Sequence, residues 1–67
     1  MLRFFNMEVL AMQSVDVVER KNAPGVWTVE AIGSDGEIYQ ALFYGPQARQ
    51  RALEYAQLKY DFKPPRQ

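Results

Sequence analysis

The chain of 67 residues contains no cysteine and no histidine. Without cysteine it has no disulfide framework and no thiol nucleophile, and without histidine it lacks the usual base near neutral pH and the commonest zinc ligands. No stretch is long enough to cross a bilayer as a helix. These absences argue against most catalytic and metal-dependent chemistry. We therefore expect no enzyme activity, no metal and no cofactor.

The composition is that of a small globular domain. Apolar residues make up 48% of the chain, too many for a disordered protein. We expect one domain over residues 1–62 and a flexible tail over 63–67, where two prolines prevent a helix. A domain this short buries little surface and often needs very good packing or oligomerisation.

Charge is balanced overall but uneven along the chain. The formal net charge is zero, whereas residues 1–45 carry −3 and residues 46–67 carry +3. The sequence therefore indicates two parts that attract each other. The opening residues briefly resemble a signal peptide, but Asn6 and Glu8 interrupt the apolar run. We expect a cytoplasmic protein.

Three strands are predicted from valine-rich and aromatic runs separated by turn residues. They cover residues 13–20, 26–32 and 37–44, and the first is expected at a sheet edge because of its charges. Pro24 and Gly25 fit a turn that needs a positive φ at the glycine.

The turn over residues 33–36 sets the register of the second hairpin. A type I turn followed by Gly36 in the left-handed conformation places Ala31 opposite Tyr39, Val29 opposite Ala41 and Trp27 opposite Phe43. A two-residue loop would shift this pairing by one and mix the two faces. We prefer the first register because it makes one face fully apolar. The second face then collects a mixed set: Val26, Thr28, Glu30, Ile32, Ile38, Gln40, Leu42 and Tyr44.

A helix is predicted from Gln47 to about Tyr60, with Gly45 as N-cap and Pro46 in the first helical position. Alanines recur at every fourth position, which lets the helix lie close to large side chains of the sheet. The residues on this stripe are Ala48, Ala52 and Ala56, and a second apolar strip contains Tyr55, Leu58 and Phe62. The fold class is thus α+β, a three-stranded antiparallel meander packed on one C-terminal helix (βββα).

One helix covers only one side of such a sheet, so the second face needs another cover. Residues 1–12 are apolar without a clear period, and they form either an added strand, a short helix or a lid. The translation start is ambiguous among Met1, Met7 and Met12. The alternative cover is a second subunit or a different protein partner. The residues expected at that interface are Val26, Ile32, Ile38, Leu42 and Tyr44.

No other group of residues is a strong candidate for a catalytic or metal-binding site. Ser14 and Ser34 have no activating partner, and Asp35 with Glu37 lacks the spacing of a calcium loop. Basic side chains on the predicted helix are candidate phosphate contacts, namely Arg49, Arg51 and Lys59.

The predicted order of three strands followed by a helix resembles two groups of proteins. The residues that carry the resemblance are Gly25-Val26-Trp27-Thr28-Val29, an Asp35-Gly36 turn, Phe43, and Ala48 and Ala52 on the helix. One is the arm-type DNA-binding domain of phage-type integrases, itself similar to the plant AP2 domain. The other comprises small bacterial proteins of unknown function with a Trp-x-Val hairpin and an alanine-rich helix. The first resemblance implies DNA binding through the sheet. This sheet differs by carrying acidic residues where Arg and Lys are expected, so no contact residues are transferred.

Two functional hypotheses follow. The first is a non-catalytic interaction module that self-associates through the second sheet face. The alternative is a nucleic-acid-binding accessory protein, of phage or plasmid type, that uses the basic helix face.

Overall fold

The computed structural model describes residues 12–64 and contains three strands followed by one helix. The strands are β1 (Met12–Glu19), β2 (Trp27–Gly33) and β3 (Ile38–Phe43), and the helix is α2 (Ala48–Tyr60). The sheet is antiparallel with the order β1-β2-β3, so β1 and β3 are its edges. This confirms the predicted α+β meander with a C-terminal helix. Residues 1–11 and 65–67 lie outside the described part, and so do most of the predictions for residues 1–12 and the tail.

The predicted register of the second hairpin is confirmed. Trp27 pairs with Phe43, Val29 with Ala41, and Ala31 with Tyr39. The turn has the expected bonds, since the Gly36 N–H donates to the Gly33 carbonyl at 2.9 Å and the Gly33 N–H donates to the Glu37 carbonyl at 2.8 Å. Gly36 has a φ of 88°, a conformation that favours glycine.

The loop between β1 and β2 also contains its predicted turn. The Val26 N–H donates to the Ala23 carbonyl at 3.0 Å, and Gly25 has a φ of 88°. This is the geometry for which a Pro-Gly pair is suited. The turn closes a hairpin that pairs Val17 with Val29 and Val15 with Ala31.

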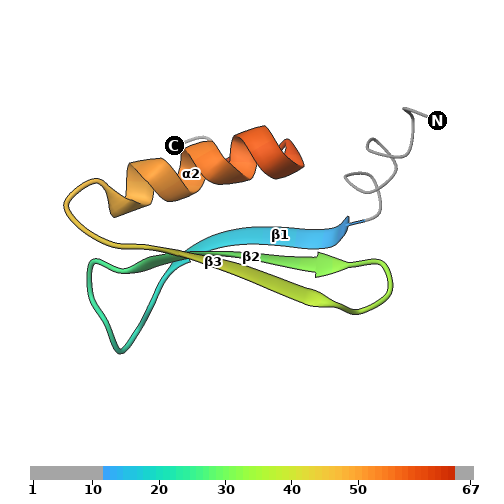
Figure 1. Ribbon diagram of the computed structural model, residues 1–67, viewed down its shortest axis with the longest axis horizontal. Coiled ribbons are helices and arrows are strands. Elements are labelled where there is room, and N and C mark those ends of the chain that lie inside the picture. The colour runs from blue at the N-terminus through green and yellow to red at the C-terminus, as the bar shows by residue number, and fades with distance from the viewer. Residues whose placement is uncertain (1–11, 65–67) are drawn as a thin grey trace.

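The core lies between α2 and the side of the sheet over which α2 runs in Figure 1. Ala52 and Ala56 are fully buried against Val29, so small helical side chains bring the helix close to the sheet. Partly buried residues complete this core: Val15, Val17, Trp27, Ala41, Phe43, Tyr55, Tyr60 and Phe62. Leu58 of the second predicted strip is 89% exposed, so that strip is only partly buried.

The helix starts later than predicted. Gln47 is the N-cap, and Ala48 is the first helical residue. Gly45 is therefore not the N-cap, because its φ of 94° puts it in a turn in which its carbonyl accepts from the Ala48 N–H at 3.1 Å. Pro46 occupies that turn and not the first helical position.

The helix ends in a left-handed residue. Asp61 has a φ of 58°, its N–H donates to the Gln57 carbonyl, and the next N–H, of Phe62, donates to the Ala56 carbonyl. The bond from Asp61 to Gln57 is that of the αL motif, in which glycine is the usual residue at the left-handed position. The motif turns Phe62 back onto the core.

Candidate functional site

The side of the sheet that points away from α2 is the candidate site, and we call it the open face. Alternate residues of each strand pack on the helix, so the others project to the opposite side. No described element covers that side (Figure 1). The open face comprises Ser14, Asp16 and Val18 of β1, Thr28, Glu30 and Ile32 of β2, Ile38, Gln40 and Leu42 of β3, and the flanking Val26 and Tyr44.

Most of the predicted interface residues are exposed on the open face. Ile38 is 69% exposed, Tyr44 is 68% exposed and Leu42 is 42% exposed, whereas Val26 and Ile32 are half-buried. The sequence prediction omitted Val18, which is 41% exposed and lies beside Thr28 on the next strand. The pairing of the first hairpin, which the sequence left undetermined, brings it there.

A polar row crosses the middle of the open face. Asp16 pairs directly with Glu30, and Glu30 pairs with Gln40 on the other side. The Gln40 amide Nε2 donates to Glu30 Oε2 at 3.1 Å. Two carboxylates opposite each other on neighbouring strands repel. The row therefore has a net negative charge, and a cation placed near it would reduce the repulsion between the two carboxylates.

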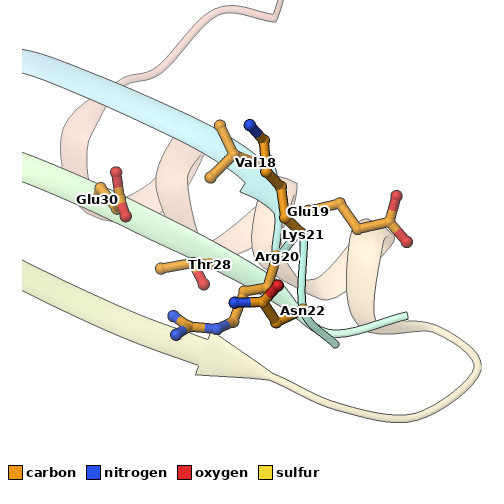
Figure 2. A pocket seen from close by; sticks show the side chains of 7 residues that line it. All are labelled: Val18, Glu19, Arg20, Lys21, Asn22, Thr28 and Glu30. Carbon is orange, nitrogen blue, oxygen red and sulfur yellow. The ribbon is translucent and has the colours of Figure 1, made fainter. Parts of the chain in front are cut away.

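A shallow depression lies at the end of the open face, next to the loop after β1. Figure 2 shows the side chains that line it: Val18, Glu19, Arg20, Lys21, Asn22, Thr28 and Glu30. Arg20 extends alongside Thr28, and Thr28 itself is fully buried. The Thr28 hydroxyl Oγ1 has no hydrogen-bond partner among residues 12–64.

The three basic residues proposed as nucleic-acid contacts do not form one patch. Arg49 lies over the Trp27 ring at 5.7 Å, and Lys59 lies about equally close to the rings of Tyr55 and Tyr60, at 6.0 and 5.9 Å. Residues two positions apart on a helix are rotated by about 200°, so Arg51 is on the opposite flank from Arg49. Lys59 is about 15 Å from Arg49 along the helix axis. A nucleic-acid role for these residues stays a prediction, and their placement does not favour it.

The described residues offer little for catalysis or metal binding. Within residues 12–64, no three acidic side chains are grouped in a way that fits a metal ion. Burial, together with the neighbouring Tyr55, raises the pKa of the Tyr60 hydroxyl above its ordinary value of 10.0. With a raised pKa the Tyr60 hydroxyl stays protonated near neutral pH, and the main cause of the shift is its burial in the core. None of the described helices has the length and apolar character needed to cross a membrane.

Comparison with known proteins assigns no family to the chain. No protein-family model matches it, and no curated protein and no solved structure matches significantly. The resemblance to integrase arm-type domains therefore stays a prediction, and the functional argument depends on the geometry of the open face.

Proposed function

We propose that this protein is a small non-catalytic interaction module that self-associates through the open face. The partner is a second copy of the same chain, and the association takes place in the cytoplasm. The observation that carries the proposal is the exposure of four apolar side chains on one side of the sheet: Val18, Ile38, Leu42 and Tyr44, each 41–69% exposed. Apolar side chains grouped on one face mark interaction sites more often than scattered ones do.

The charges on the open face suit a two-fold arrangement of two copies. Asp16 and Arg20 lie two residues before and after Val18 on one side of the chain. A two-fold axis along the row of Val18, Thr28 and Leu42 places Arg20 of one copy over Asp16 of the other. Each copy then brings a cation to its partner's acidic row, and the row of Val18, Thr28 and Leu42 is buried at the centre.

The test compares two leucines that differ in location. Leu42→Gln removes an apolar side chain from the open face, and Leu58→Gln removes one from the outer surface of α2, where it is 89% exposed. We expect Leu42→Gln to weaken the dimer by about tenfold or more in Kd, measured by sedimentation equilibrium, because the central apolar contact is lost. Leu58→Gln is expected to leave the Kd unchanged. Equal Kd values for the two variants and the wild type would exclude the open face as the interface.

A further inference from the structure

The two edges of the sheet differ in how they are protected. Edge strands expose unpaired backbone groups, and proteins usually protect them with charges, bulges or proline. On β1, Asp16 and Glu19 are charged, and the pairing with β2 is irregular between Met12 and Ser14. β3 (Ile38–Phe43) and the following Tyr44 contain no charged residue and no proline, and the pairing of β3 with β2 has no irregularity.

The hydrogen bonds of the hairpin show which backbone groups of β3 face outward. Gly33 and Glu37 form a hydrogen-bonded pair. Such pairs alternate along an antiparallel ladder, so Tyr39, Ala41 and Phe43 bond to β2. The residues between them are Ile38, Gln40 and Leu42. Their N–H and C=O groups point away from β2, toward the outer edge of the sheet. No other described strand pairs with this edge, which lies at the rim of the sheet in Figure 1.

We propose that this edge of β3 pairs, antiparallel, with β3 of a second copy. A two-fold axis at Ala41 places Ala41 opposite its own copy, Gln40 opposite Leu42, and Ile38 opposite Tyr44. This register pairs the whole uncharged segment with itself, so no like charges meet. It also uses the outward-facing backbone groups of both copies. The result is a continuous six-stranded sheet.

The absence of charge favours a second copy as the occupant. A different partner strand could carry complementary charges, but β3 presents none to select it. The same pairing on β1 would bring acidic side chains of two copies close together. This inference rests on the self-association proposed above and adds a second contact to it, through backbone groups and not through the open face.

The first test uses cysteine, which the chain lacks. In the proposed register Ala41 and its copy form a non-hydrogen-bonded pair, whose Cβ separation is close to that of a disulfide. We expect Ala41→Cys to form a disulfide-linked dimer about tenfold or more faster than Ser14→Cys, which places the thiol on the β1 edge, because pairing raises the local thiol concentration. Equal rates would overturn the proposal and leave a strand of another protein as the alternative occupant.

The second test removes one outward N–H. Proline is tolerated at an edge position whose N–H faces solvent, so Gln40→Pro keeps the pairing with β2 and blocks the pairing with another copy. Gln40→Ala is the matched control, because both variants lose the side-chain bond to Glu30. We expect Gln40→Pro, but not Gln40→Ala, to weaken association by about tenfold or more in Kd. If Gln40→Pro does not fold by circular dichroism, the cysteine test decides.

The outcomes separate the two contacts. If Leu42→Gln lowers the native mass and Gln40→Pro matches its alanine control, the open-face proposal stands and the edge proposal is overturned. If Gln40→Pro lowers the mass and Leu42→Gln does not, the edge proposal stands and the open-face proposal is overturned. A wild-type chain that stays monomeric overturns both.

Discussion

The buried hydroxyl of Thr28 provides a sharp stability test. The residue is fully buried, and its Oγ1 has no hydrogen-bond partner among the described residues. Its neighbours across the sheet are Val18 and Leu42, whose side chains offer no polar atom. A buried polar group left without a partner costs about 1–3 kcal/mol. Valine has nearly the same shape and carries a methyl group in place of the hydroxyl.

We therefore expect Thr28→Val to stabilise the protein by about 1–3 kcal/mol. For a domain of this size, 1 kcal/mol corresponds to a rise in Tm of about 4–8 °C. The assay is thermal and urea unfolding, followed by circular dichroism at one fixed protein concentration, because association also changes apparent stability.

Thr28→Ser is the control, because it keeps the hydroxyl and removes a buried methyl group. We expect it to destabilise the protein by about 1 kcal/mol. A Thr28→Val protein that is less stable than the wild type would refute the reasoning, because it would mean that the hydroxyl has a partner in solution.

Four further predictions concern the helix and its surroundings. Ala52→Leu should cost about 1–3 kcal/mol in urea unfolding, because Ala52 is fully buried against the sheet and a larger side chain forces the helix away; Gln57→Leu, on the exposed side, is the control. Asp61→Gly should gain about 0.5–1 kcal/mol, because glycine adopts a φ of 58° without strain and the exposed Lys63–Asp61 pair contributes little; a loss would contradict this account of the helix end. The raised pKa of Tyr60 shows that the folded state favours the neutral hydroxyl. The contribution of this hydroxyl to the free energy of unfolding is therefore fully present below the ordinary pKa of 10.0, and it is lost as the pH rises through the folded pKa. Tyr60→Phe should therefore show a smaller fall in unfolding free energy than the wild type between about pH 8 and about pH 11. If the helix binds nucleic acid, Arg51→Gln should weaken binding to a DNA duplex and reduce its salt dependence; we expect no salt-dependent binding in a filter assay, because the three cations are dispersed.

The second hairpin was predictable because its turn chemistry is local. Gly36 takes the only conformation compatible with a three-residue loop and a bulge, and that loop fixes every pair from Ile32–Ile38 to Trp27–Phe43. The alanine stripe of the helix follows from its period in the same way. Both features depend on residues close together in the sequence.

The open face was predictable only in part. The position of Val18 and the placement of Asp16 opposite Glu30 depend on the pairing of β1 with β2, and the loop between these strands has no single preferred register in the sequence. The burial of Thr28 depends in addition on the surrounding side chains, among them Arg20. The N-cap of the helix was predicted two residues too early because glycine suits both an N-cap and a turn with positive φ.

The measurement that tests the central claim most directly is the native mass of the wild-type chain by light scattering, over a wide range of concentrations. The account predicts a mass that rises with concentration above the 7.8 kDa of one chain. A Kd of 1 mM corresponds to a binding free energy of only about −4 kcal/mol, so even a weak dimer is detectable at that concentration. A mass that stays at 7.8 kDa up to about millimolar concentration would therefore contradict self-association.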